Sequence, residues 1–84
     1  MYALEFKTSV FKDFARIPTE DQKRIWQKMQ SLKSTPRPSD CRKLIGRKSD
    51  FRLRQGNYRI IYQVLDDQQK IVIIRVEHRK DIYR

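Results

Sequence analysis

Hydrophobic and polar residues alternate most regularly between positions 51 and 64, and this stretch predicts a β-hairpin. In its first part apolar residues alternate with arginines, which is the period of two of a strand with one packed face. The alternating residues are Phe51, Arg52, Leu53 and Arg54. Gly56 and Asn57 predict a two-residue turn, because glycine accepts the positive φ of the first central position. Apolar residues occupy both parities from 58 to 64, which predicts a buried central strand containing Tyr58 and Tyr62.

The N-terminal part of the chain predicts a strand followed by a helix. Residues 2–6 alternate as a short strand with one buried face. Thr8 or Ser9 is placed to cap the helix, and Pro18 to end it. Its apolar stripe has helical spacing and consists of Val10, Phe11, Phe14 and Ile17.

A second helix follows directly. Thr19 with Gln22 three residues later is a capping-box pattern, and we expect the helix to run to about Ser34. Its apolar face comprises Ile25, Met29 and Leu32, with Trp26 at the margin.

A loop and a weakly periodic basic segment connect the second helix to the hairpin. The prolines in 36–40 predict the loop, because each proline biases its predecessor away from helical geometry. From 41 to 50 the residues expected to anchor the segment in the core are Leu44 and Ile45, with a turn at Gly46.

After the hairpin, residues 66–69 predict a second hairpin loop before a last strand over 70–77. In that strand Val72, Ile74 and Val76 share one parity and Ile71 and Ile73 the other.

These elements predict a single α+β domain over residues 1–84. The N-terminal strand and the two-helix hairpin precede a three-stranded antiparallel meander, and the helices pack on one sheet face because their apolar stripes need a surface to cover. The other face then exposes Arg52 and Arg54, with Arg59 near the turn and the C-terminal tail close to the strand ends. We expect a shallow basic groove there.

The positive net charge of the chain indicates which kinds of partner it binds. The chain has 84 residues and a formal net charge of +10, which predicts a polyanion: nucleic acid, an acidic protein or an anionic membrane surface. Residues 42–59 contain seven Lys and Arg residues against Asp50 alone, so six of the ten net charges lie in this segment. The positive charge therefore forms a patch.

The amino-acid composition also indicates the cellular compartment and whether the protein holds a cofactor. The single Cys41 cannot form an internal disulfide, and the N-terminus lacks the apolar core of a signal peptide, so we expect a cytoplasmic protein. No run approaches the roughly 20 apolar residues of a membrane span. One histidine and one cysteine make no metal-ligand cluster, and no glycine-rich loop exists to hold a nucleotide. We expect neither a metal nor another cofactor.

Two runs in the C-terminal half, KLIGRKSDFRLRQGNYRIIYQVLDD and IVIIRVEHRKDIYR, contain the segments K-L-x-G, R-L-R, G-x-Y-R-I-I-Y and V-x-H-R-x-D-x-Y. With these segments the chain resembles the RelE branch of the RelE/ParE toxin superfamily. The resemblance covers nearly the whole chain and is specific in residues 43–84. It implies a toxin of a type II toxin-antitoxin system that acts as an endoribonuclease on mRNA in the ribosomal A site. It also implies an antitoxin that neutralises the toxin by direct binding.

The resemblance assigns candidate residues. Its phosphate-binding and catalytic positions fall on Arg52, Arg59, Arg79 and Tyr83, with Arg54 beside them and His78 where some members have histidine. The further basic candidates for RNA contact are Lys43, Arg47 and Lys48.

Two positions depart from the family pattern. Asp50 stands where some members have lysine, so Lys48 or Arg47 would have to replace that lysine. Glu77 stands where glycine is common.

The chemistry can also be argued from the residue types. Metal-free RNA cleavage uses the 2′-hydroxyl as nucleophile, so the protein must position it, stabilise phosphoryl charge and move protons. Arginine forks pair with phosphate in a bidentate manner. Proton transfer falls to Tyr83 or His78. Each functional assignment has a purely structural alternative. The arginines would then be solvated charges on an exposed strand face, and His78 a residue at a strand end. For Tyr58 and Tyr62 we expect the core and not a platform on which bases stack.

Two other functions compete with the nuclease. A ParE-like toxin would inhibit gyrase by binding, without nuclease residues, and the joint presence of Arg59, Arg79 and Tyr83 argues against it. A non-enzymatic RNA-binding module would need only the basic patch.

Overall fold

The computed structural model describes residues 1–46 and 50–82, the last two by their backbone alone. The strands are β1 (Ala3–Phe6), β2 (Arg42–Lys43), β3 (Asp50–Gln55), β4 (Tyr58–Leu65) and β5 (Lys70–His78). The helices are α1 (Thr8–Phe14), α2 (Thr19–Ser31) and α3 (Arg79–Ile82), with a 3₁₀ turn, η1, at Asp66–Gln68. In this part of the chain no helix is long and apolar enough to cross a membrane.

All five strands form one sheet in the order β1-β5-β4-β3-β2. The predicted antiparallel meander is β3-β4-β5. It is extended at one edge by β1, which runs parallel to β5, and at the other by β2, which is antiparallel to β3. The α+β fold is confirmed, and β2 is an addition that the weakly periodic basic segment did not predict.

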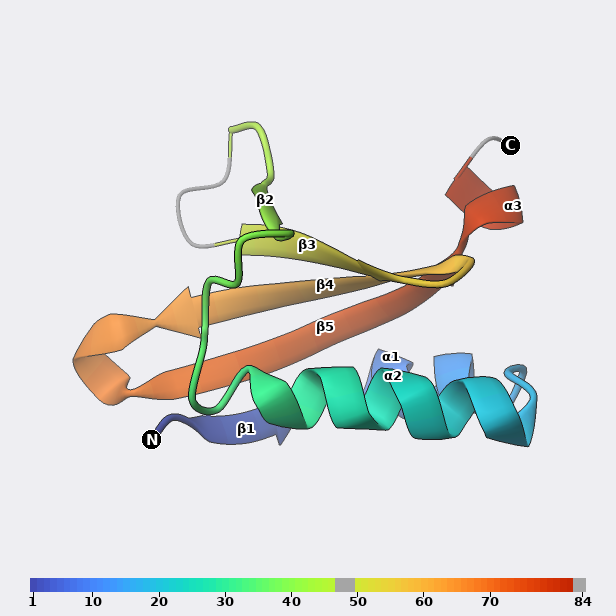
Figure 1. Ribbon diagram of the computed structural model, residues 1–84, viewed down its shortest axis with the longest axis horizontal. Coiled ribbons are helices and arrows are strands. Elements are labelled where there is room, and N and C mark those ends of the chain that lie inside the picture. Colours follow the sequence, from blue (N-terminus) through green and yellow to red (C-terminus); the bar gives the residue numbers. More distant parts are fainter. Residues whose placement is uncertain (47–49, 83–84) are drawn as a thin grey trace.

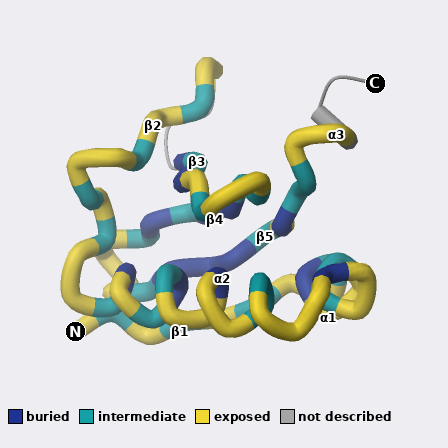
Figure 2. The backbone as a smooth tube through the Cα atoms, turned by 45° about the vertical axis from the view of Figure 1, so that its right-hand side comes forward, coloured by how far each residue is buried: buried dark blue, intermediate teal, exposed yellow. Residues whose placement is uncertain are grey.

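Both long helices pack on the same face of the sheet. In Figure 1 α1 and α2 lie together at the bottom, whereas β2 and α3 lie at the top. The core between α2 and the sheet contains the predicted α2 stripe and alternate residues of β3, β4 and β5 (Figure 2). Its fully buried members are Ile25, Met29, Leu32, Leu53, Ile60, Tyr62, Ile71 and Ile73. Tyr62 is therefore a core residue, and Tyr58 is half-buried against the same core.

The predicted hairpin turn is confirmed. Gly56 has φ +60°, and Asn57 is not among the positive-φ residues, so the turn has the type II′ pattern. β4 lies between β3 and β5, as expected of a central strand.

A β-bulge in β5 changes which residues share a face. Ile61 pairs with Arg75 but Tyr62 pairs with Ile73, so Ile74 is the extra residue. After the bulge, Val76 joins the core with Ile71 and Ile73. The parity predicted for the last strand therefore holds only for its first half.

Helix α1 differs from the prediction at both ends. Lys7 is its N-cap and makes no side-chain cap, and the helix ends at Phe14 before a turn that buries Ile17. Neither Thr8 nor Ser9 caps it. Instead the Ser9 hydroxyl donates to the Ile74 carbonyl (2.5 Å). Phe11, expected in the buried stripe, is 65% exposed.

The edge of β5 explains where α1 sits. β1 pairs with β5 only as far as Ile73. Beyond that point α1 takes over the edge: Ser9 bonds the Ile74 carbonyl, and Asp13 Oδ2 accepts from the Val76 N–H (2.9 Å). Side chains of α1 thus satisfy backbone groups that would otherwise lack a neighbouring strand.

Helix α2 begins at Thr19 without the predicted capping box. Its N-cap is Pro18, and the Gln22 amide donates to the carbonyls of Phe14 (2.7 Å) and Ile17 (3.0 Å). Gln22 therefore caps the end of α1 and fixes the helical hairpin. The helix ends at Ser31, three residues before the predicted Ser34.

Two apolar residues lie on the surface. Trp26 is 46% exposed and stacks on Phe6, with ring centroids 5.6 Å apart. Ile45 is fully exposed, so the prediction that it anchors the basic segment is wrong. Leu44 is half-buried, and Gly46 has the predicted turn conformation with φ +79°.

A polar cluster ties the loop after α2 to the β4–β5 connection. Arg37 donates to both Asp66 carboxylate oxygens (2.6 and 3.3 Å), and the Tyr2 hydroxyl donates to Asp66 Oδ1 (2.6 Å). The bonds from Arg37 and then Tyr2 lower the pKa of Asp66.

Candidate nucleic-acid interface

Four arginines of β2, β3 and β4 lie on the sheet face that the helices leave uncovered. Phe51, Leu53 and Ile60 belong to the core, so the residues between them on β3 and β4 point to the other face. In the strand register Arg42 is opposite Arg52, and Arg54 is opposite Arg59. We call Arg42, Arg52, Arg54 and Arg59 the arginine strip.

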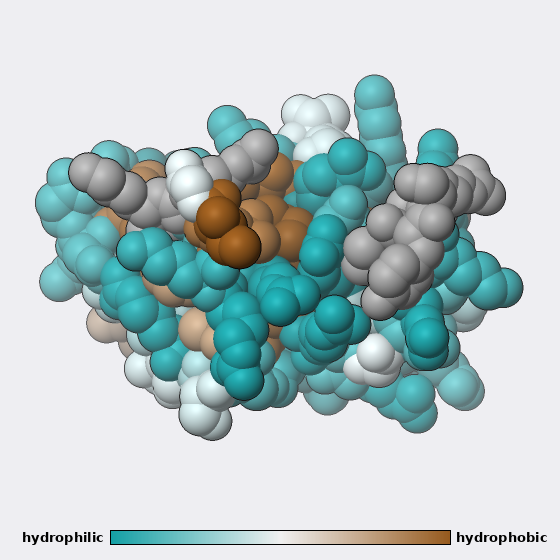
Figure 3. All heavy atoms as spheres, turned by 90° about the horizontal axis from the view of Figure 1, so that it is seen from above, coloured by the Kyte–Doolittle hydropathy of each residue, from teal (hydrophilic) through white to brown (hydrophobic). Residues whose placement is uncertain are grey.

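The strip places like charges directly across from each other. Directly opposite side chains in an antiparallel pair have Cβ atoms roughly 4.5–5.5 Å apart, and like charges there are destabilising. Seen from the side of β2 and α3, the surface consists mostly of hydrophilic side chains around a smaller apolar group (Figure 3). A bound polyanion would offset the repulsion between the arginines.

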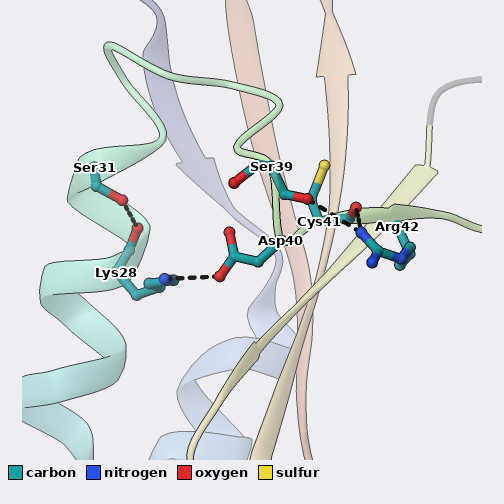
Figure 4. Close-up of polar contacts among 6 residues, drawn as sticks. All are labelled: Lys28, Ser31, Ser39, Asp40, Cys41 and Arg42. Atoms are coloured by element: carbon teal, nitrogen blue, oxygen red, sulfur yellow. Dashed lines mark hydrogen bonds and ion pairs between the residues drawn. The ribbon is translucent and has the colours of Figure 1, made fainter.

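A shallow hollow lies within the strip. It has a volume of about 170 Å³ and is lined by Asp40, Arg42, Arg52 and Arg54. Figure 4 shows Asp40 pointing toward α2, where it accepts from Lys28 Nζ (3.1 Å), and Arg42 pointing away from that helix. The bond from Lys28 lowers the pKa of Asp40, so this carboxylate stays charged.

The loop before β2 holds Arg42. Its Nη1 donates to the carbonyls of Ser39 (3.2 Å) and Cys41 (2.9 Å) (Figure 4). These bonds keep one nitrogen of the guanidinium against the backbone at the rim of the hollow.

Arg59 is paired with a carboxylate on the neighbouring strand. It lies opposite Glu77, and its Nε and Nη2 both donate to Glu77 Oε1 (3.2 and 2.8 Å). Arg59 therefore has Arg54 on one side and Glu77 on the other.

The C-terminal tail starts beside the hairpin turn. Arg79 is the first residue of α3, is exposed, and donates its backbone N–H to the Asn57 carbonyl (2.8 Å). A second hollow at this end is lined by Asn57, His78, Arg79 and Lys80. As expected, the tail lies at the strand ends, close to the turn that precedes Arg59.

His78 is separated from the strip. It lies opposite Tyr58, and their rings meet edge to face with centroids 5.0 Å apart. Its Nδ1 accepts from the Lys80 backbone N–H (3.1 Å). Burial, and then the Asp21 carboxylate, raise the pKa of Tyr58, so its phenol keeps its proton beside the imidazole.

The structure therefore brings together part of the predicted set. Arg52, Arg54 and Arg59 share one face, and Arg79 starts at the turn end of the same hairpin. Lys43 is exposed but lies opposite Phe51, so it has the parity of the core-facing residues. The predicted residues Arg47, Lys48 and Tyr83 lie outside the described residues.

Two arginines on this face were not among the predicted site residues. Arg42 lies in the basic segment, but two residues give no strand period that could have placed it. Arg75 lies opposite Ile61 on the uncovered face only because of the bulge at Ile74. A charged residue on the otherwise buried parity of Ile71 and Ile73 was the signal for that bulge.

Acidic residues near the strip are few and engaged. Asp50 is buried at the start of β3, opposite Gln63. Among the described side chains no group of three or more His, Cys, Asp and Glu residues could hold a metal ion.

Comparison with known proteins identifies the family. A family model described as the ParE toxin of the type II toxin-antitoxin system, parDE, matches residues 4–83. The RelE protein in a RelB-RelE antitoxin-toxin complex from Methanococcus jannaschii is 30% identical, with a TM-score of 0.78 and 94% of each chain covered. The chain belongs to the RelE branch of the RelE/ParE toxin superfamily.

Other relatives of this RelE-branch toxin agree. The toxin RelE1 of Methanocaldococcus jannaschii is 29% identical over 86 residues, which cover 99% of this chain and 96% of the relative. An archaeal RelE-RelB complex from Pyrococcus horikoshii OT3 has a TM-score of 0.83 at 28% identity, with 93% of this chain and 94% of that chain covered. The resemblance drawn from the sequence motifs is confirmed, and the chain is a toxin of the type II toxin-antitoxin class.

Proposed function

We propose that this toxin is an endoribonuclease that cleaves mRNA held in the ribosomal A site and thereby inhibits translation in the cytoplasm. The observation that supports this most is the arginine strip, in which Arg42 opposes Arg52 and Arg54 opposes Arg59. Such opposition costs folding free energy, and an RNA backbone would offset that cost.

The proposed chemistry is attack of the 2′-hydroxyl oxygen on the adjacent phosphorus, which forms a 2′,3′-cyclic phosphate as the bond to the 5′-oxygen of the next nucleotide breaks. The 2′-hydroxyl loses a proton and the leaving 5′-oxygen gains one, so the step needs no metal or other cofactor. Arg52 and Arg54 contact phosphates along the strand, with Arg42 extending the contact surface. Arg59 and Arg79 stabilise the charge that develops on the phosphoryl oxygens. The 2′-hydroxyl requirement makes RNA the substrate and excludes DNA.

Tyr83 or His78 transfers a proton, either from the attacking 2′-hydroxyl or to the leaving 5′-oxygen. The Nδ1 of His78 accepts from the backbone of the tail, and its ring contacts Tyr58. These contacts favour a role in orienting the tail and leave Tyr83 as the preferred proton-transfer group. Arg47, Lys48 and Lys43 remain candidates for further RNA contacts.

The direct test uses purified toxin, ribosomes and a defined mRNA. Toeprinting on stalled ribosomes is expected to show new 3′ ends near the A site, while gyrase supercoiling stays unchanged. Intact mRNA together with inhibited supercoiling would move the protein to the ParE-like class. RNA binding without cleavage would reduce it to a binding module.

We further propose that a cognate antitoxin with net negative charge and apolar anchors neutralises the toxin. The structures of relatives described as RelB-RelE antitoxin-toxin complexes support such a partner. So do the net charge of +10 and the exposed rings of Phe11 and Trp26. Opposite charge speeds association, and apolar anchors slow release. Co-purification with the product of the adjacent gene tests this, and a toxin that stays active in that complex would contradict it.

A further inference from the structure

The contact between Arg59 and Glu77 is more enclosed than the other ion pairs that join two described residues. Both side chains are only about one-fifth exposed (20% and 21%), whereas the other pairs each have at least one partner more than one-third exposed. An enclosed pair is screened less by salt and holds its geometry better than a surface pair.

The geometry of this pair leaves part of the guanidinium for another acceptor. Nε and Nη2 lie along one edge of the planar group, and both donate to Glu77 Oε1. The Nη1 end points away from that edge, because the guanidinium fork is rigid. A phosphate approaching the arginine strip can therefore meet Arg59 while Glu77 still holds it.

Glu77 also lies on the face that would bind RNA. Its register partner is Arg59, so its carboxylate has the parity of the strip. A negative charge there opposes binding of a polyanion, and a residue serving affinity alone would not be acidic.

We propose that Glu77 is a positioning residue for Arg59, which fixes the guanidinium for the reacting phosphate at a cost in RNA affinity. This inference rests on the proposed function, in which Arg59 stabilises charge in the transition state. If Glu77 positions Arg59, removing Glu77 changes the affinity for substrate and the cleavage rate of the bound complex in opposite directions. Removing a purely structural ion pair would lower both.

The test compares Glu77→Ala and Glu77→Gln with wild type on ribosomes carrying a defined mRNA. Glu77→Ala is expected to bind more tightly, because a negative charge is removed. At saturation it is expected to cleave about ten- to a hundredfold more slowly, the scale of misplaced catalytic groups. Glu77→Gln is expected to bind more tightly as well but to recover much of the rate, since its amide oxygen accepts the same two bonds.

Asp67→Ala is the matched control. It makes the same change in net charge in the exposed turn between β4 and β5, away from Arg59. It is expected to leave the saturated rate unchanged. A Glu77→Ala variant that binds more tightly and cleaves as fast as wild type would overturn the proposal, as would a loss of both affinity and rate.

A second measurement keeps this inference separate from the nuclease proposal. The Nε–H of Arg59 is expected to exchange with solvent at least about tenfold more slowly in wild type than in Glu77→Ala, because two bonds hold the group. Equal exchange rates would overturn the positioning role. If the wild-type protein cleaves no mRNA but shows the slow exchange, the nuclease function is refuted. Glu77 would then still hold the Arg59 guanidinium in place, but not for catalysis.

Discussion

The two faces of the sheet use neighbouring residues for opposite purposes. On β3, Leu53 is completely buried under the helices, while Arg54, the next residue, is exposed on the other face. The covered face gains stability from apolar burial, whereas the uncovered face collects like charges that cost stability. Stability and RNA contact are therefore expected to be separable by substitution at adjacent positions.

The two faces of the sheet do not differ simply as one apolar and one polar face. Ile61 lies on the uncovered face and is still 93% buried, with Arg52 and Arg75 directly opposite on either side. Arginine side chains can cover apolar surface with their methylene groups while the charged ends reach solvent. Arg52 and Arg75 are therefore placed to cover Ile61 as well as to present charge.

The largest expected effect is on the covered face. Leu53→Ala is expected to lower the free energy of unfolding by about 2–5 kcal/mol, because it leaves a cavity under the helices. Arg54→Ala, one residue away, is expected to change it by no more than about 0.5 kcal/mol. Chemical denaturation of both variants measures the contrast, and similar losses would show that the strip is part of the stabilising structure.

The next effect concerns the C-terminal tail. Tyr83→Phe is expected to retain binding but to reduce single-turnover cleavage by roughly a hundredfold or more, because the only exchangeable proton of the ring is lost. His78→Gln is the control, with a smaller loss expected, since His78 contacts Tyr58 and the tail backbone. A fully active Tyr83→Phe beside an inactive His78→Gln would assign proton transfer to the histidine.

A smaller effect distinguishes charge on the two sides of the molecule. Arg54→Ala is expected to weaken ribosome binding and to reduce the salt dependence, by about one in the slope of log affinity against log salt. Lys23→Ala removes an equal charge from an exposed position of α2 and is expected to leave the slope nearly unchanged. Equal slopes for the two variants would mean that net charge, and not the strip, drives binding.

The smallest effect lies outside both faces, in the cluster of Tyr2, Arg37 and Asp66. Because the pKa of Asp66 is lowered in the folded state, its stabilising contribution is present above the ordinary value of 3.8 and is lost as pH falls through the lower folded value. Asp66→Asn is expected to melt at a slightly lower temperature than wild type near pH 7. The difference should disappear in strong acid, and a difference independent of pH would exclude the charge of Asp66 as its cause.

Local patterns in the amino-acid sequence were enough to predict the hairpin and the placement of its arginines. Alternation on β3 and the Gly56-Asn57 turn are properties of adjacent residues, so they specify the strands, their pairing and the exposed side of Arg52 and Arg54 without knowledge of the rest. The family motifs likewise lie in one continuous half of the chain. The apolar stripe of α2 belongs to the same class of local signal.

Features that depend on residues distant in the sequence became visible only in the folded chain. Arg42 and Lys43 form a strand only because the edge of β3 is there to pair with them. Gln22 binds the end of α1 instead of capping α2, because packing of the helical hairpin brings those carbonyls within reach.

The same reason governs the candidate site. The bulge at Ile74 moves Arg75 to the uncovered face and His78 to the covered one, and Arg59 meets a carboxylate 18 residues away in sequence. Local periodicity shows only that the alternation breaks at Arg75, and it does not say where the one-residue offset between the paired strands lies. The position of a charge relative to its cross-strand partners is therefore decided by the assembled sheet.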